Sequence, residues 1–142
     1  MKSSRDSVRT PKTLIETIKK HFNVSKWTDP VPYVPFFDPT KHKDALKIEW
    51  RDDVYYVNPP YSRMRVFVKY ANEMHKKFGT KIILLAKAES LCTQYFKSLE
   101  NHHLTILSKH VRFDSEKYTQ NAHFGSVIIS WGLKEPGKFE VI

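Results

Sequence analysis

A short loop between an expected strand and an expected helix carries the residues best suited to chemistry in this sequence. The apolar run Val54-Tyr55-Tyr56-Val57 has the character of a strand, and it ends abruptly at Asn58-Pro59-Pro60-Tyr61. The residues from Ser62 onward have the spacing of a helix. In open α/β sheets ligands bind beyond the carboxyl ends of the strands, so this loop occupies the position expected of a reacting group.

The residue types of this loop suit the transfer of a group to an exocyclic amine. Two consecutive prolines remove two backbone donors and fix two φ angles, which stiffens the loop. The side-chain oxygen of Asn58 and the carbonyl of Pro59 could accept the two amine hydrogens, and the ring of Tyr61 offers a surface for stacking. Such dipoles would stabilise the charge that develops when a base amine attacks a methyl sulfonium, provided that the base is flipped out of its duplex. The alternative is a purely structural Pro-Pro turn, which the flanking strand and helix disfavour.

Helices and strands alternate around this loop and predict an α/β fold. Thr10 is a candidate cap for a first helix that reaches Phe22, with Pro11 in its first turn. Ser62 is a candidate cap for a second helix, which Gly79 ends. The remaining apolar segments predict a strand, a helix and two strands, over residues 81–86, 91–99, 104–107 and 125–131. Together they predict a shortened, mostly parallel sheet with an antiparallel final strand.

The overall composition predicts one domain over residues 1–142, with residues 1–9 as a flexible arm. The single cysteine, Cys92, excludes a disulfide within the chain and is expected to be a semi-buried structural thiol. The seven histidines lack the spacing of metal ligands, so we expect no metal site. The first residues lack the apolar core of a signal peptide, and no long apolar run indicates a membrane span. We therefore expect an intracellular, cytoplasmic protein without membrane association.

An excess of positive charge favours a polyanionic partner such as nucleic acid. The chain has 24 lysines and arginines against 15 acidic residues, for a formal charge of +9. Many basic proteins bind nothing in particular, so charge alone leaves this open. Candidate DNA contacts lie at the start of the second helix and in a basic, aromatic stretch before the last strand, which could equally be a solvated loop: Ser62, Arg63, Arg65, Lys109, Arg112 and Lys117.

The motifs, taken in order, resemble those of the small phage-type DNA N6-adenine methyltransferases. Thr10-Pro11 opens the first helix, and an acidic segment Phe37-Asp38-Pro39 follows. An Asp-x-Leu-x-x-x-Trp stretch comes next, formed by Asp44, Leu46 and Trp50. The Asn-Pro-Pro-Tyr tetrapeptide is the specific element, and the resemblance covers most of residues 9–131.

This resemblance implies a class I, Rossmann-like methyltransferase fold that uses S-adenosylmethionine and acts on adenine in double-stranded DNA. It suggests a phage or viral origin, with action inside a host cell. It places Thr10 and Pro11 by the methionine part of the cofactor, and Asp38 and Pro39 beneath it. Asp44 and Leu46 would approach the cofactor's adenine, and the target base would be held by Asn58, which also borders the cofactor, with Pro59, Pro60 and Tyr61.

Several alternatives remain at this point. The same tetrapeptide can serve cytosine N4, an RNA base or a protein glutamine, although the positive charge disfavours a protein substrate. The four glycines include none that follows Asp38, where the wider superfamily has a glycine-rich loop. A nucleic-acid-binding module on a degenerate methyltransferase scaffold is therefore the alternative of another class. A homodimer could also complete an abbreviated cofactor pocket.

Overall fold

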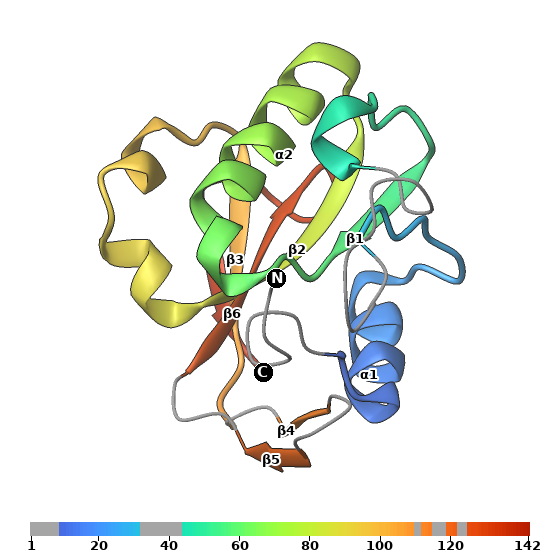
Figure 1. The fold of residues 1–142 in the computed structure, drawn as a ribbon, viewed down its shortest axis with the longest axis vertical. Coiled ribbons are helices and arrows are strands. Elements are labelled where there is room, and N and C mark those ends of the chain that lie inside the picture. The colour runs from blue at the N-terminus through green and yellow to red at the C-terminus, as the bar shows by residue number, and fades with distance from the viewer. Residues whose placement is uncertain (1–8, 32–43, 110–111, 115–118, 122–124) are drawn as a thin grey trace.

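A five-stranded sheet with helices packed on it forms the frame of the molecule (Figure 1). The computed structural model describes residues 9–31, 44–109, 112–114, 119–121 and 125–142. The strand order is β1-β2-β6-β3-β7, and β4 and β5 form a separate two-stranded sheet. The strands are β1 (Val54–Val57), β2 (Lys81–Lys87), β3 (His102–Ile106), β4 (Arg112–Asp114), β5 (Thr119–Asn121), β6 (Ser126–Trp131) and β7 (Phe139–Val141).

The large sheet is mostly parallel in direction, as expected. β1 pairs parallel with β2, and β3 pairs parallel with β7. β6 is antiparallel to both of its neighbours, β2 and β3, so it alone runs against the other four strands. The reversed strand is thus the last long one in the sequence, and the short strand β7 that follows it was not predicted. Gly132 and Gly137, with φ of 79° and 77°, allow the turn that returns the chain to β3.

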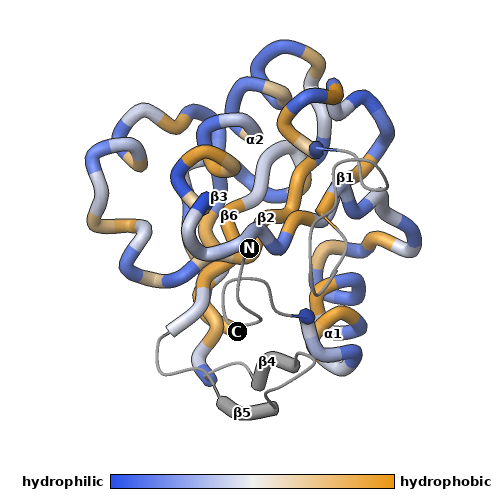
Figure 2. Tube along the Cα trace, in the orientation of Figure 1, coloured by the Kyte–Doolittle hydropathy of each residue, from blue (hydrophilic) through white to orange (hydrophobic). Residues whose placement is uncertain are grey.

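α1 (Lys12–Phe22) and α2 (Met64–Phe78) cover opposite faces of the sheet, so its central strands are buried on both sides. Tyr55 and Val57 of β1 belong to the core beneath α2. Val54 and Tyr56 alternate with them and belong to the core beneath α1. Figure 2 shows the same pattern as hydrophobic colour along the central strands between the helices. This α/β/α layering confirms the predicted fold class at the level of an α/β sheet.

α1 (Lys12–Phe22) begins one residue later than predicted, and Thr10 does not cap it. Pro11 holds the N-cap position with no side-chain hydrogen bond, and its carbonyl accepts from the Ile15 N–H at 3.0 Å. The Thr10 hydroxyl is used in the site described below. At the other end Asn23 adopts a left-handed conformation with φ of 55°, which closes the last turn.

One boundary of α2, its C-terminal end, agrees with the prediction, and its N-terminal start does not. Gly79 ends the helix in a left-handed conformation, and its N–H donates to the His75 carbonyl at 2.7 Å, which confirms the prediction. Ser62 does not cap the helix, because it lies within a single 3-10 turn, η2 (Tyr61–Arg63), that the prolines lead into. Arg63 occupies the N-cap position without a side-chain hydrogen bond.

The predicted helix over residues 91–99 is wrong. Two short 3-10 helices, η3 (Ala88–Cys92) and η4 (Tyr95–Ser98), take its place. Thr93 between them is extended, and its hydroxyl donates to the Ser90 carbonyl at 2.6 Å, so the backbone cannot continue as one helix. Cys92 is exposed rather than semi-buried. In the described part of the chain, no helix combines the length and apolarity that a bilayer crossing requires.

A polar cluster joins α1 to the far edge of the sheet. One oxygen of the Glu140 carboxylate, Oε2, lies 2.9 Å from His21 Nε2 and 2.8 Å from His103 Nε2. The Thr105 hydroxyl donates to the same oxygen at 3.1 Å. Partial burial raises the pKa of Glu140, but these hydrogen bonds outweigh it and lower the pKa to about 2. The carboxylate therefore ties β7 to both β3 and α1.

Candidate functional site

Three parallel segments run toward the same end of the sheet, where the Asn-Pro-Pro-Tyr loop lies. Besides β1 and β2, a short segment around Thr28 pairs parallel with Tyr55. The Thr28 N–H donates to the Val54 carbonyl at 2.8 Å, and the Tyr56 N–H donates to the Thr28 carbonyl at 3.0 Å. Asp29, Asn58 and Lys87 each follow or end one of these neighbouring parallel segments, so three polar side chains lie toward the carboxyl end of the sheet, where ligands bind.

The loop itself is rigid for the reasons that its sequence indicates. Pro59 and Pro60 are both buried, and Pro60 is extended with φ of −57° and ψ of 139°. The Pro60 carbonyl accepts from the Arg63 N–H at 3.0 Å, which fixes the passage into η2 and α2. The half-buried side chain of Asn58 is thus carried by a backbone with little freedom to adjust.

Thr10 contacts Asn58 across 48 residues of sequence. The Asn58 side-chain nitrogen, Nδ2, donates to Thr10 Oγ1 at 3.0 Å. Thr10 Oγ1 also lies 2.7 Å from the hydroxyl of Tyr56. The structure therefore brings a predicted cofactor residue and the predicted catalytic asparagine into direct contact.

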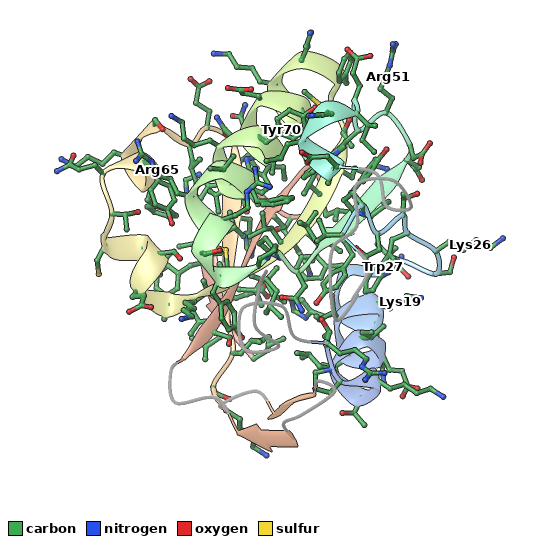
Figure 3. All side chains as sticks on the ribbon, viewed as in Figure 1. Lys19, Lys26, Trp27, Arg51, Arg65 and Tyr70 are labelled. Atoms are coloured by element: carbon green, nitrogen blue, oxygen red, sulfur yellow. The ribbon has the colours of Figure 1, made fainter. Side chains whose placement is uncertain are left out.

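Tyr56 supports this contact from inside the fold. Its ring is buried and stacks on Trp27, with centroids 4.4 Å apart and an interplanar angle of 17°. Figure 3 shows Trp27 with Lys19 beside α1, and Lys19 Nζ lies 4.7 Å from the Trp27 ring centroid. Burial raises the pKa of Tyr56 far above its ordinary value, against the opposing effect of the Thr10 hydrogen bond. The phenol is therefore neutral and retains its hydrogen-bonding proton.

Asp29 is the acidic residue that the sequence analysis missed. Because Thr28 is level with Tyr55, Asp29 lies beside Tyr56, and its charge contributes to the raised pKa of that phenol. Asp29 is exposed as a residue, yet the surrounding protein desolvates its carboxyl and raises the pKa, which the hydrogen bond from the Val31 N–H partly offsets. The signal was present, since Trp27-Thr28-Asp29-Pro30 is an aromatic Asp-Pro segment like the predicted one. The predicted pair, Asp38 and Pro39, lies outside the described residues.

Tyr61 presents its ring at the start of η2. The ring is partly buried against the core beneath α2, and Lys87 Nζ lies 4.3 Å from its centroid. Lys87 Nζ is also 3.9 Å from the Glu89 carboxylate. A cation at the end of β2 therefore covers one face of the tyrosine that was predicted to stack on a base.

The Asp-x-Leu-x-x-x-Trp stretch is held on the α2 side of β1. Asp44 caps a 3-10 turn, η1 (Ala45–Lys47), by accepting from the Leu46 N–H at 3.0 Å. The Trp50 indole donates to the Ala45 carbonyl at 3.1 Å and stacks on Tyr55 with a centroid distance of 5.5 Å. Asp44 and Leu46 thus lie on the other side of β1 from Thr10, whose partner Tyr56 faces α1.

The predicted DNA contacts fall into two groups. Around the start of α2, Ser62 and Arg65 are exposed, and the half-buried Arg63 places its guanidinium carbon 5.8 Å from the Phe67 ring centroid. Figure 3 shows Arg65 and the Lys19–Trp27 pair on opposite sides of the view. In the second group, Lys109 is exposed, Arg112 begins β4, and Lys117 lies outside the described residues.

Comparison with known proteins decides the family. A family model described as DNA N-6-adenine-methyltransferase (Dam) matches residues 1–136. The chain belongs to this family. The Dam match includes Thr10, Asp29 and the whole Asn58–Tyr61 loop, and it confirms the resemblance seen in the motifs. Neither the comparison with curated proteins nor the comparison with solved structures gave a match.

Membership in the Dam family makes the chain a DNA adenine-N6 methyltransferase, with DNA as its substrate. The excess of positive charge agrees with that substrate, because lysine and arginine neutralise backbone phosphates. The alternatives left open by the sequence, a cytosine, RNA or glutamine acceptor or a non-catalytic binding module, gain no support from this match. The geometry at the carboxyl edge of the sheet can therefore be interpreted as that of a methyltransferase.

Proposed function

We propose that this Dam protein transfers a methyl group from S-adenosylmethionine to N6 of an adenine flipped out of DNA, and that Asn58-Pro59-Pro60-Tyr61 is its catalytic loop. The observation that supports this most is the anchored asparagine at the carboxyl edge of the sheet. Asn58 Nδ2 is bound to Thr10, so the carbonyl corner of the same amide lies on another side of the side chain. An acceptor held on a rigid loop is what a weakly nucleophilic aromatic amine requires.

The acceptor pair for the amine is Asn58 Oδ1 and the Pro59 carbonyl. Each would accept one hydrogen of the amine, which directs the nitrogen lone pair out of the base plane as the new bond forms. The neighbouring Pro60 carbonyl is already used by the Arg63 N–H. Because the burial of both prolines fixes the backbone, these acceptors need little reorganisation during the reaction.

Tyr61 is the proposed stacking surface for the flipped base. Lys87 Nζ lies 4.3 Å from its ring centroid, so the ammonium group would lie near the stacked adenine. In that position the ammonium group strengthens the ring contact and lies close to the path of the DNA backbone. Ser62, Arg63 and Arg65 follow directly in η2 and α2, where we propose that they contact phosphates.

The donor side of the site fits a cationic ligand in its chemistry. When bound, S-adenosylmethionine supplies an electrophilic methyl group on a sulfonium. Asp29 places a carboxylate at the same end of the sheet as Asn58. Thr10, which contacts Asn58, and Pro11 lie just before α1. We propose that these three border the methionine part of the donor. Asp44 and Leu46, on the other side of β1, stay candidates for contact with its adenine. Asp38 and Pro39 stay candidates for the donor site.

The sheet is compatible with a shortened class I methyltransferase fold. Its single reversed strand, β6, lies between β2 and β3. The proposed catalytic loop follows β1, which is an outer strand of the sheet. The short segment at Thr28 extends this edge by one further parallel pairing. We propose that this abbreviated edge takes the place of the longer sheet of larger class I enzymes.

The test is methyl transfer with an identified product. Wild-type protein and Asn58→Ala would be incubated with radiolabelled S-adenosylmethionine and mixed-sequence duplex DNA, and the DNA digested to nucleosides. We expect label in N6-methyldeoxyadenosine with the wild type and a loss of about 100-fold or more in the variant. Label in N4-methyldeoxycytidine would retain the loop chemistry and refute adenine as acceptor. DNA binding without any transfer would refute the proposed function.

A further inference from the structure

The amide of Asn58 has two chemically different corners, and only one of them can accept a hydrogen from an amine. If the amide turned by 180°, Nδ2 would face the substrate with two N–H groups and repel the amine hydrogens. Catalysis by this side chain therefore depends on which corner faces the base. In the structure Nδ2 is directed to Thr10 Oγ1 at 3.0 Å, which sets the orientation.

Thr10 is well built to hold that corner. Its side chain is almost completely buried, and its branched Cβ restricts rotation of the hydroxyl-bearing carbon. Its oxygen meets the Tyr56 hydroxyl at 2.7 Å, where either group can be the donor. When Thr10 donates to the phenol, only its lone pairs remain toward Asn58, and Nδ2 is then the one corner of the amide that can bind it. The amide is thus anchored to β1 and not only to its own loop.

Tyr56 makes this anchor rigid. The phenol is buried in the core beneath α1, and Trp27 stacks on its ring at 4.4 Å. Desolvation keeps the phenol protonated, so the hydroxyl stays a hydrogen-bonding partner of Thr10 across the working pH range. A continuous set of contacts therefore links the aromatic stack, the two hydroxyls and the amide.

We propose that Thr10 is a positioning residue for methyl transfer, whose hydroxyl, held by Tyr56, orients the Asn58 amide so that Oδ1 faces the target amine. This inference rests on the proposed role of Asn58. It gives Thr10 a role toward the acceptor base that is separate from contact with the methyl donor. It also explains why Thr10 precedes α1 without capping it, because its hydroxyl is committed to Asn58 and Tyr56.

A carboxylate at position 58 can show whether Thr10 acts by orienting the side chain at position 58 or only by supporting donor binding or stability. Its two oxygens are equivalent acceptors, so no rotation of the group presents a donor to the base. The Thr10 hydroxyl should then matter in the native protein and lose most of its importance in an Asn58→Asp background. A Thr10 that acted through donor binding or through stability would matter equally in both backgrounds.

The experiment is a double-mutant cycle of Thr10→Val and Asn58→Asp, with Thr10→Ser as the conservative variant. Single-turnover methyl transfer is measured at saturating donor and DNA, beside donor affinity and thermal unfolding. We expect Thr10→Val to slow transfer about 10- to 100-fold in the native background and less than about 3-fold in the Asn58→Asp background. Thr10→Ser should stay within about 3-fold of the native rate.

Equal losses in both backgrounds, or a loss confined to donor affinity, would overturn the positioning role. Absence of N6 transfer by the wild-type protein would instead refute the proposed function. A measurement independent of turnover covers the case in which Asn58→Asp is inactive. In ¹⁵N spectra Thr10→Val should shift the Asn58 side-chain NH₂ signals and speed their exchange with water. The reference is Asn72 in α2, whose side-chain oxygen accepts from the Trp131 indole, and its NH₂ signals should stay unchanged. Unaltered Asn58 signals would contradict the proposal.

Discussion

The indole of Trp27 lies nearly parallel to the phenol of Tyr56, with ring centroids 4.4 Å apart and 17° between their planes. This pair joins the segment that leads to Asp29 with the strand that leads to Asn58. Tyr56 thereby faces the core on one side and directs its hydroxyl to Thr10. A packing contact in the fold and a hydrogen bond in the site are parts of one arrangement.

Loss of the aromatic stack between Trp27 and Tyr56 should weaken the stability of the fold. Trp27→Ala removes a half-buried indole and exposes Tyr56, so we expect the free energy of unfolding to fall by about 2 kcal/mol. Trp27→Phe keeps a ring over Tyr56 and should lose less than about 1 kcal/mol. Urea unfolding measures the difference. Equal losses in the two variants would show that stacking is not what Trp27 contributes.

Arg65 should contribute a phosphate contact, and Arg51 should not. Both side chains are exposed, but Arg65 follows the Asn58–Tyr61 loop, whereas Arg51 precedes β1 at the other end of the strand. We expect Arg65→Gln to reduce the slope of log affinity against log salt by about one unit. Arg51→Gln serves as the matched control and should leave the slope unchanged. The two slopes can be taken from fluorescence anisotropy of a labelled duplex at increasing salt, and identical slopes would exclude the assigned contact.

Asp29 should make binding of the methyl donor dependent on pH. Desolvation by the surrounding protein raises the pKa of its carboxyl to about 6, so the group gains its negative charge only as pH rises through that value. Affinity for the cationic donor should therefore increase from pH 5 to pH 7. Asp29→Asn should bind more weakly at pH 7, by about 10-fold, and lose this dependence. Calorimetric titrations at several pH values provide the test.

Asp53 offers the matched control for that experiment. It is exposed at the amino end of β1 and forms a 3.8 Å ion pair with Lys81. Asp53→Asn should leave both the affinity and its pH dependence as in the native protein. A pH dependence that persists in Asp29→Asn would assign the titrating group elsewhere.

Glu140 should stabilise the fold against acid. Because hydrogen bonds lower its pKa from 4.5 to about 2, its contribution is complete above about pH 4.5 and disappears as pH falls through about 2. Glu140→Gln should lower the free energy of unfolding at pH 7 by about 1–3 kcal/mol. The gap between variant and native protein should narrow as pH falls below 4.5. Urea unfolding from pH 3 to pH 7 measures it, with Glu16→Gln on the exposed side of α1 as control.

The strands were predictable because central strands of a covered sheet are apolar on both faces. β1 and the central residues of β2 and β6 therefore appear as hydrophobic runs, and Gly79 marks the end of α2 as expected. The 3-10 helices around Thr93 were not predictable from periodicity, because the apolar spacing of this segment does not indicate that the backbone at Thr93 is extended. β7 was missed because its apolar side chains, Phe139 and Val141, are exposed and its central Glu140 is polar.

The stiff Asn-Pro-Pro-Tyr loop after β1 was predictable and its surroundings were not. Asn-Pro-Pro-Tyr is a local signal, since a stiff polar loop after a strand needs only adjacent residues. Trp27-Thr28-Asp29-Pro30 and Phe37-Asp38-Pro39 look alike in sequence. The hydrogen bonds of Thr28 with β1 place Asp29 beside Tyr56, and the second segment lies outside the described residues. Likewise, Thr10 has the composition of a helix cap, and a contact 48 residues away gives it another role.

That long-range contact makes activity more fragile than the fold. Thr10 is reached only when the chain before α1 docks onto β1, whereas the strands that form the sheet core do not include it. Partial release of this segment would free the Asn58 amide while the sheet stays intact, because local opening requires less free energy than global unfolding. Mild denaturant would then inactivate the enzyme before it unfolds the protein, and hydrogen exchange near Thr10 would report the loss.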